Sequence, residues 1–402
     1  MKRAVGPFLL LISLLVGAVP LVAQQLELGR DQPLIDAGKI DAFARENIPV
    51  FTTATLANGI PVIIKRSTAN RILTLQVVLR GHVAFTPPGK AGIEAAMLTL
   101  MTRGSAHYTY DDVQRALFED SASIDPHFGS FDVTSLDLVT IDSYFDRLLP
   151  IFADAFLHPS WSAEEFSQVI RDLQLRKQRT ANDPYTQAVE RLHDVLFAGH
   201  PYAASWEGVG DSLGALTLAD VRSYYEKTVG SGRLFIVAVG DFDPASLVAK
   251  LNTTFGAMPR TAYAAPAVSP LTVKPDLLVV PWAQSPGLAW VRGDFPMPAP
   301  DSPDFAASLV AFDLLSDVLF EILRTRNGAC YGASAGLHGF DASYGDITVF
   351  KTTMPQKVKP MIDEAIGVVA SGRSMGGNVS ASAAGKSGIG SGETAAASAF
   401  VP

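Results

Sequence analysis

Histidine, cysteine and serine are the residues whose spacing could signal hydrolytic chemistry in this chain. No two of the seven histidines are three or four residues apart, the spacing that would place two zinc ligands on one helix face. The single cysteine, Cys330, has no sequence hint of a partnering base, and no Gly-x-Ser-x-Gly elbow occurs. We therefore expect Cys330 to be a small buried side chain, while zinc held by residues far apart in the sequence stays an alternative. The histidines are His82, His107, His127, His158, His193, His200 and His338.

A family resemblance begins in the segment from Gly92 to Ser105. This segment resembles the helix that carries the inverted zinc signature His-x-x-Glu-His in active peptidases of the insulinase/pitrilysin family. Under that resemblance the two histidine positions fall on Ala95 and Thr99, the glutamate position falls on Leu98, and the third ligand falls at or next to Arg176. Catalytic zinc needs three nitrogen, sulfur or oxygen donors and a nearby carboxylate, so the resemblance implies no zinc in this chain.

Further motifs follow the family pattern in the same order along the chain. They extend the resemblance over roughly Phe51 to Val369, and together they are more specific than any one alone. The resemblance implies an α+β fold like that of mitochondrial processing peptidase, with two homologous domains that each have helices on one face of an antiparallel sheet. These motifs are His200-Pro201-Tyr202, Gly208, Val239-Gly240-Asp241-Phe242-Asp243, Phe255-Gly256 and Ala283-Gln284-Ser285.

The stretch from Leu323 to Tyr331 resembles a second functional motif of the family, Leu-Arg-x-x-x-Gly-x-x-Tyr. By that resemblance Arg324 and Tyr331 bind the substrate backbone, and both side chains can donate hydrogen bonds to a peptide carbonyl. Gly328 would let the chain leave the helix tightly, so that both side chains point to one place. The alternative is structural, with Arg324 a solvated cation near a helix end and Tyr331 an ordinary strand aromatic.

The elements that must position these residues can be predicted from periodicity and capping. The turn Asn58-Gly59 leads into a strand, and alternating apolar residues predict a second strand paired with the first. A buried helix is predicted from Gly92 to Thr102, and Thr109, Ser162 and Thr217 each begin a helix because an acidic residue follows three positions later. The strands are predicted at Ile60 to Lys65, Leu73 to Leu79, Asp132 to Ile141 and Leu234 to Val239.

The chain divides into two predicted domains joined by a linker. Residues 51–259 form the first, residues 260–275 are rich in Pro, Ala, Thr and Ser and form the linker, and residues 276–370 form the second. The second domain is predicted to contain strands at Leu277 to Val280 and Gly287 to Arg292, then a helix from Ser302 to Arg326. A strand pair leading to a helix thus occurs twice, which suggests an internal duplication.

The two ends of the chain have distinct compositions. Residues 1–23 have the basic, apolar and small-residue regions of a secretory signal, so we expect export, a periplasmic location and cleavage after Ala23, an uncleaved anchor being the alternative. Residues 24–50 are a polar arm. Residues 371–402 are dominated by Gly, Ser and Ala, so we expect a disordered tail, and the second domain looks truncated, for which a frameshift is one hypothesis.

Charge and hydropathy narrow the function further. Removing two of the 32 basic and none of the 40 acidic residues with the signal leaves a net charge of −10, which disfavours nucleic acid as a partner. No later segment is long and apolar enough for a stable membrane span. The resemblance implies a chain inactive alone that binds peptide substrate beside a zinc-bearing partner subunit with His-x-x-Glu-His. The alternatives are a structural scaffold or peptide-binding subunit without a role in proteolysis, and an autonomous metallopeptidase.

Overall fold

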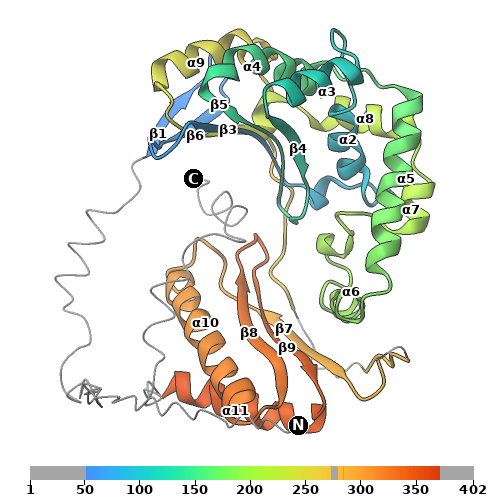
Figure 1. The fold of residues 1–402 in the computed structure, drawn as a ribbon, viewed down its shortest axis with the longest axis vertical. Helices are drawn as coiled ribbons and strands as arrows, with labels where there is room; N and C mark the ends of the chain where they lie inside the picture. Colours follow the sequence, from blue (N-terminus) through green and yellow to red (C-terminus); the bar gives the residue numbers. More distant parts are fainter. Residues whose placement is uncertain (1–50, 273–278, 284, 372–402) are drawn as a thin grey trace, which may run out of the picture. The chain divides into compact units, whose positions relative to one another are not determined.

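A computed structural model describes residues 51–272, 279–283 and 285–371. The predicted signal peptide and arm, and the tail after Ser371, lie outside these residues. Within them the chain is α+β, as expected: a six-stranded sheet comes first and a three-stranded sheet second (Figure 1). None of the described helices has both the length and the apolar character that crossing a bilayer requires.

The six-stranded sheet has the order β1-β2-β6-β3-β5-β4. All neighbouring strands are antiparallel except β2 and β6, which are parallel. A purely antiparallel sheet was expected, and this one pair departs from it. The strands predicted at 60–65 and 73–79 correspond to β2 and β3. Their predicted pairing with each other is wrong, because β6 lies between them and forms hydrogen bonds with both. The strands are β1 (Phe51–Thr55), β2 (Pro61–Arg66), β3 (Ile72–Arg80), β4 (Ser123–His127), β5 (Val133–Ile141) and β6 (Leu234–Gly240).

The predicted helix starts are confirmed by their caps. Thr109 and Thr217 form capping boxes at α3 and α8, and the Ser162 side chain accepts from the Glu165 N–H at α5. α4 and α9 lie over one face of the sheet (Figure 1). The α-helices are α2 (Ile93–Met101), α3 (Tyr110–Glu119), α4 (Asp142–Leu157), α5 (Ala163–Thr180), α6 (Pro184–Leu196), α7 (Gly210–Gly214), α8 (Leu218–Thr228) and α9 (Pro244–Thr253). The short 3₁₀ turns are η1 (Val83–Phe85), η2 (Pro201–Ala203), η3 (Ser231–Arg233) and η4 (Phe255–Ala257).

The three-stranded sheet has the order β7-β9-β8, with both pairs antiparallel. Val279 and Val280 are outside any strand, so this part of the strand predicted at 277–280 is wrong, and residues 277 and 278 lie outside the described part. The helix predicted from Ser302 starts three residues later and changes to π-helical geometry before the Arg/Tyr motif. The elements are β7 (Ala289–Pro296), α10 (Phe305–Leu319), the π-helix η5 (Phe320–Arg326), β8 (Cys330–His338), β9 (Tyr344–Thr352) and α11 (Pro355–Ala370).

The second sheet repeats part of the first. In the first part of the chain, β3 is followed by helices, then by β4, β5 and α4, and these strands lie in the order β3-β5-β4. In the second, β7 is followed by α10 and η5, then by β8, β9 and α11, and the strands lie in the order β7-β9-β8. The repeated unit is therefore strand, helix, two strands and helix, rather than the strand pair and helix that the sequence suggested. In the described residues the second repeat stops at α11, without counterparts of α5 to α9 and β6.

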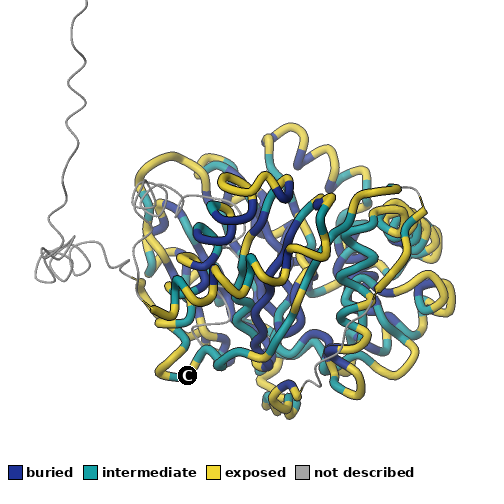
Figure 2. The backbone as a smooth tube through the Cα atoms, turned by 90° about the horizontal axis from the view of Figure 1, so that it is seen from below, coloured by how far each residue is buried: buried dark blue, intermediate teal, exposed yellow. Residues whose placement is uncertain are grey.

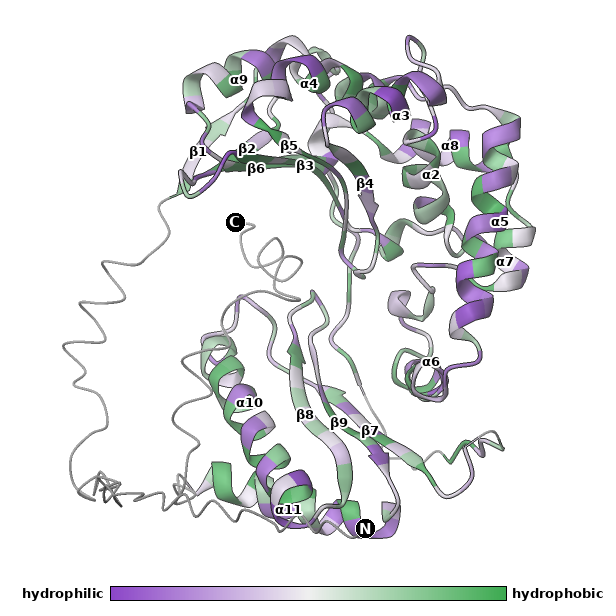
Figure 3. Ribbon diagram, viewed as in Figure 1, coloured by the Kyte–Doolittle hydropathy of each residue, from purple (hydrophilic) through white to green (hydrophobic). Residues whose placement is uncertain are grey.

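Three apolar clusters hold these elements together. The largest lies between the six-stranded sheet and its helices, and the second lies between the three-stranded sheet, α10 and α11. Figure 2 shows the corresponding buried stretches of backbone, and Figure 3 shows that the inner strands of the large sheet are among the most hydrophobic segments. The third cluster includes Phe131, Phe197 and Tyr202 with Ala342 and Tyr344, so the loop between β8 and β9 packs against residues of the first part.

Candidate functional site

The residues at the degenerate zinc signature belong to the core. Ala95 and Leu98 of α2 are fully buried. The Thr99 hydroxyl donates to the Ala95 carbonyl at 2.7 Å, so it is already used within its own helix. Neither a methyl group nor an isobutyl group can bind a metal, and the residues present therefore do not fit a catalytic zinc ion.

Arg176, at the third ligand position, also cannot serve. It lies on the exposed side of α5, and its guanidinium carbon is 5.6 Å from the centroid of the Phe128 ring. A guanidinium stays protonated and offers no lone pair to a metal. Among the residues that the structure describes, no three His, Cys, Asp or Glu side chains come together as a metal site would need.

Glu94, next to Ala95, is a buried acid of α2 with three hydrogen-bonding neighbours. Arg233 donates from one nitrogen to both Glu94 oxygens, at 3.0 and 2.8 Å, and the Thr134 and Tyr224 hydroxyls also donate to this carboxylate. Burial has the largest single effect and raises the pKa of Glu94, but the charges of Arg233 and His82 and the hydrogen bonds from Thr134 and Tyr224 together hold the pKa below its ordinary value. The carboxylate is therefore charged, satisfied and closed to solvent, which suits a structural role and not that of a general base. Sequence reasoning missed it, although it is the one acid in that apolar segment.

The structure brings Arg324 and Tyr331 together. Arg324 lies in the last turn of η5 and Tyr331 follows Cys330 at the start of β8, and the guanidinium carbon of Arg324 is 5.7 Å from the centre of the Tyr331 ring. Tyr331 is 67% exposed, and the Lys351 Nζ atom lies 5.8 Å from the centre of the Tyr331 ring. One guanidinium nitrogen donates to the Cys330 carbonyl at 3.0 Å, and the described residues supply no second acceptor, so the other N–H groups can bind one.

The turn between η5 and β8 explains this proximity. Gly328 has φ +55°, a left-handed conformation that favours glycine, and its N–H donates to the Arg324 carbonyl. Cys330 is buried, as expected, and burial raises the pKa of its thiol despite the nearby Arg324 charge. A neutral buried thiol is a poor nucleophile, so the two donors, and not Cys330, are the chemically available groups here.

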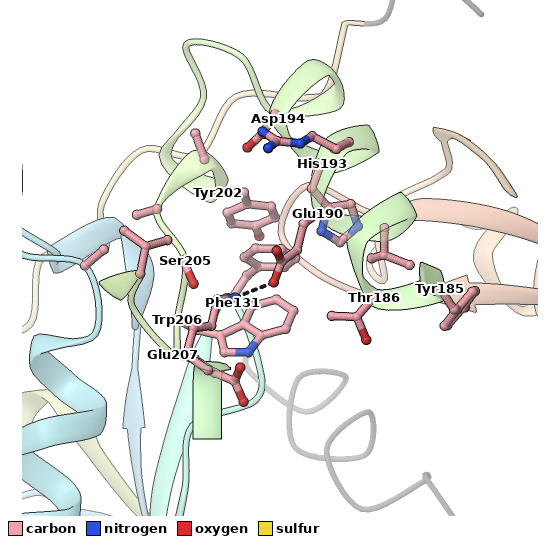
Figure 4. Close-up of a pocket in the computed structure, with 17 residues that line it drawn as sticks. Phe131, Tyr185, Thr186, Glu190, His193, Asp194, Tyr202, Ser205, Trp206 and Glu207 are labelled. Carbon is pink, nitrogen blue, oxygen red and sulfur yellow. Dashed lines mark hydrogen bonds and ion pairs between the residues drawn. The ribbon is translucent and has the colours of Figure 1, made fainter. Parts of the chain in front are cut away.

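A pocket of about 660 Å³ lies beside α6, in the first part of the chain (Figure 4). It is lined by aromatic residues, among them Phe131 and Trp206, whose ring centres are 4.6 Å apart. These residues were not singled out from the sequence, although Tyr202 and Gly208 of the same loop belong to the motifs that carry the family resemblance. An aromatic, partly open pocket of this size can take up a side chain or a short peptide segment.

The charged groups of this pocket are mostly paired. Glu190 pairs with Lys177, and Asp194 pairs with Arg191 at 3.3 Å. Glu207 lines the same pocket and has no hydrogen-bond or ion-pair partner for its carboxylate within the described part of the chain. An unpaired carboxylate beside an indole ring favours a ligand group with hydrogen-bond donors or positive charge.

A family model matches the later part of the chain and agrees with the family resemblance seen in the sequence. Residues 215–373 match the family model of the peptidase M16 inactive domain. No curated protein sequence matches the chain. The matched residues run from the end of α7 through α8, β6 and the three-stranded sheet, so they include the Arg/Tyr motif but not α2.

Solved structures share the fold at low sequence identity. The peptidase M16 inactive domain from Pseudomonas fluorescens has a TM-score of 0.72 at 17% identity, over 81% of this chain and 80% of that chain. A protease from Helicobacter pylori has a TM-score of 0.71 at 18% identity, over 82% of each chain. The periplasmic protease PqqL from Escherichia coli has a TM-score of 0.59 at 14% identity, over 75% of this chain and 35% of that one. The resemblance to the insulinase/pitrilysin family is thereby confirmed: the chain has the fold of M16 proteins, and its residues 215–373 match the model of the inactive domain.

Proposed function

We propose that this chain is the non-catalytic, substrate-binding partner subunit of a heteromeric zinc endopeptidase of the insulinase family. A partner subunit with His-x-x-Glu-His would hold the zinc and cleave the peptide. Arg324 and Tyr331 of this chain would contact the peptide backbone, and their donors could stabilise the oxyanion that forms on the scissile carbonyl. The periplasm is the proposed compartment, which the composition of residues 1–23 and the likeness to a periplasmic protease support.

One contrast carries this proposal. The side chains at the zinc positions are a methyl group, an isobutyl group, a hydroxyl used within its helix and an exposed cation, while the Arg324 and Tyr331 pair stays together and open to solvent. A chain with the second feature and without the first can bind a peptide but needs a partner to hydrolyse it. The pocket beside α6 offers a further place for a peptide side chain, with Trp206 and Glu207 as its available groups.

A structural scaffold is the second candidate, and one contact favours it. Arg324 donates to the Cys330 carbonyl of its own chain, so part of its hydrogen-bonding capacity already supports the turn into β8. If that were its whole purpose, Arg324 and Tyr331 would matter for folding and not for proteolysis.

Reconstituted activity separates the two candidates. The chain is mixed with an insulinase-family subunit that carries His-x-x-Glu-His, and cleavage of a fluorogenic peptide is followed. We expect cleavage to need both chains, and Arg324→Ala to lower kcat/KM by about 10²-fold, the usual cost of removing one oxyanion donor. Tyr331→Phe removes only the phenolic donor and is expected to lower kcat/KM in the same direction.

Arg326→Ala is the matched control, because Arg326 lies two residues from Arg324 and pairs with Glu321 at 3.4 Å. It should leave kcat/KM within about twofold, as for other surface changes. Full activity in both the Arg324 and the Tyr331 variants would support the scaffold instead. Peptide cleavage by this chain alone, abolished by a chelator, would contradict the proposal altogether.

A further inference from the structure

Lys351, near the end of β9, has a backbone conformation that residues with a Cβ atom rarely adopt. Its φ is +56°, in the left-handed region that favours glycine. Among the described residues other than glycine, only Ser121 and Trp161 also have a positive φ. Backbone strain of this kind is most common at ligand-binding and catalytic sites. It therefore suggests a function for the Lys351 side chain.

The left-handed conformation directs Lys351 away from the core. Ile347 and Val349 of β9 belong to the second apolar cluster, so strict alternation would place the side chain of residue 351 on the same buried face. Instead Lys351 is exposed, and the next residue, Thr352, is fully buried. The strained residue thus brings a charged side chain, which the core would not accept, to Tyr331 at the surface.

Two aromatic rings position the ammonium group of Lys351. Its Nζ atom lies 5.8 Å from the centre of the Tyr331 ring and 5.4 Å from the centre of the Phe350 ring, and the two ring centres are 6.4 Å apart. The Phe350 ring in turn contacts the rings of Tyr185 and Trp290, with centres 5.6 and 6.0 Å away. Because aromatic faces attract cations, these rings favour one place for the charge at the end of a long side chain.

Arg324 and Lys351 are two cations without an anionic partner in the described part of the chain. The guanidinium carbon of Arg324 is 5.7 Å from the centre of the same tyrosine ring. Arg326, two residues away, does have carboxylates near it, Glu321 at 3.4 Å and Glu364 at 3.9 Å. In a chain with a formal net charge of −8, two unpaired cations beside one ring make a local positive site that favours an anionic ligand.

We infer that Lys351 is a specificity-determining residue, which binds a carboxylate of the peptide next to the carbonyl that Arg324 and Tyr331 contact. This role rests on the peptide-binding part of the proposed function, because it requires a peptide at that pair. An acidic side chain and a free C-terminal carboxylate offer the same chemistry to an ammonium group. Lysine acts as a point charge without the fixed geometry of a guanidinium, so both sources of the carboxylate fit. The expected substrate class is therefore acidic peptides.

Peptide binding to this chain alone tests the role of Lys351 without a partner subunit. Three peptides of one sequence, each with a neutral fluorophore and a C-terminal amide, carry Glu, Gln or Lys at the same central position. A fourth carries Gln and a free C-terminal carboxylate, which separates the two sources of the charge. The full chain is titrated against each peptide, and fluorescence anisotropy gives the Kd. We expect the Glu peptide, the free-acid peptide or both to bind at least fivefold more tightly than the Gln amide, and the Lys peptide to bind most weakly. Because exposed charges are screened, this preference should shrink as salt is added.

Substitutions locate the preference to Lys351. Lys351→Gly removes the charge and suits the left-handed backbone, so it should bring the Kd values of the acidic and neutral peptides within twofold of each other without lowering the unfolding midpoint. A preference lost from a variant of unchanged stability cannot be lost through unfolding. Lys351→Arg keeps the charge and should keep the preference. Lys357→Gln is the matched control, because Lys357 is another exposed lysine, at the start of α11, and the preference should remain.

Several outcomes would overturn the role of Lys351. These are equal binding of the acidic and neutral peptides, no binding of any of the four, and a preference that Lys351→Gly leaves unchanged. Cleavage of the Gln amide by this chain together with a zinc-bearing subunit reports separately on the proposed function. If cleavage fails while the preference is present and is lost in Lys351→Gly, the proteolytic role is wrong and the carboxylate site is supported. If cleavage occurs and all the peptides bind equally, the proteolytic role is supported and the carboxylate site is wrong.

Discussion

At the scale of single residues, Glu94 shows how α2 is held where active family members would bind zinc. Its carboxylate joins α2 to η3 through Arg233, to β5 through Thr134 and to α8 through Tyr224. Both charged side chains of the Glu94 and Arg233 pair are almost fully buried. A buried charge without its partner is costly, so the pair fixes the helix only while both members are present.

Replacing Glu94 by Gln should therefore destabilise the fold strongly. The amide cannot neutralise Arg233, and breaking one side of a buried ion pair typically costs about 3–5 kcal/mol. Urea denaturation followed by circular dichroism gives the change in the free energy of unfolding. Glu207→Gln is the matched control, because Glu207 has no partner in the described part, and it should change that energy by less than about 0.5 kcal/mol. Equal effects of the two variants would show that the ion pair does not hold α2.

The sequence could predict some of these residues and not others. The proximity of Arg324 and Tyr331 could be predicted because both belong to a local motif of nine positions, in which a tight turn at Gly328 brings the two side chains together. Glu94 and Arg233 are 139 positions apart, so their pairing depends on the tertiary fold. Which residues line the pocket beside α6 depends in the same way on how α6 and the loop at Trp206 come together.

At the scale of elements, capping residues predicted helix starts well, and strand pairing was predicted poorly. Thr109, Ser162 and Thr217 act through a partner three residues away, so their signal is contained in the sequence. The insertion of β6 between β2 and β3 brings together segments more than 150 residues apart, which no periodicity can reveal. For the same reason the sequence did not reveal that the repeated unit is strand, helix, two strands and helix.

The start of α2 depends on the close approach of two glycines. Gly92 has φ +85°, and a Cβ atom on it would lie 2.8 Å from the Gly208 Cα atom. Gly92→Ala should lower the free energy of unfolding by about 1–2 kcal/mol from the left-handed backbone alone, with the steric clash adding to it. Gly210→Ala is the control, since a Cβ there meets no atom within 4 Å, and its effect should be small. Thermal unfolding of both variants provides the comparison; similar midpoints would contradict the importance of this approach.

At the scale of the whole molecule, a polar contact accompanies the apolar cluster between the first part of the chain and the loop between β8 and β9. The Asp132 carboxylate accepts from the Tyr202 hydroxyl and, at 2.7 Å, from the Asp341 N–H, and the Tyr202 oxygen accepts from the Ala342 N–H at 3.2 Å. Burial raises the pKa of Asp132 to about 6, and the Asp341 charge adds to this, while the two donors act in the opposite direction.

The stability of the molecule should therefore depend on the ionisation of Asp132. Because its pKa rises from 3.8 to about 6 on folding, the folded chain binds the proton more tightly between these values. The free energy of unfolding should fall by about 2 kcal/mol as the pH rises from 4 to 6, and by about 3 kcal/mol in all between a pH well below 3.8 and a pH well above 6. Urea denaturation at a series of pH values measures this, with the difference between the wild type and Asp132→Asn isolating the one carboxyl. Asp125→Asn, at an exposed position of β4, should follow the wild-type curve. An Asp132→Asn curve that also runs parallel to the wild type would show that this carboxyl does not set the pH dependence of the junction.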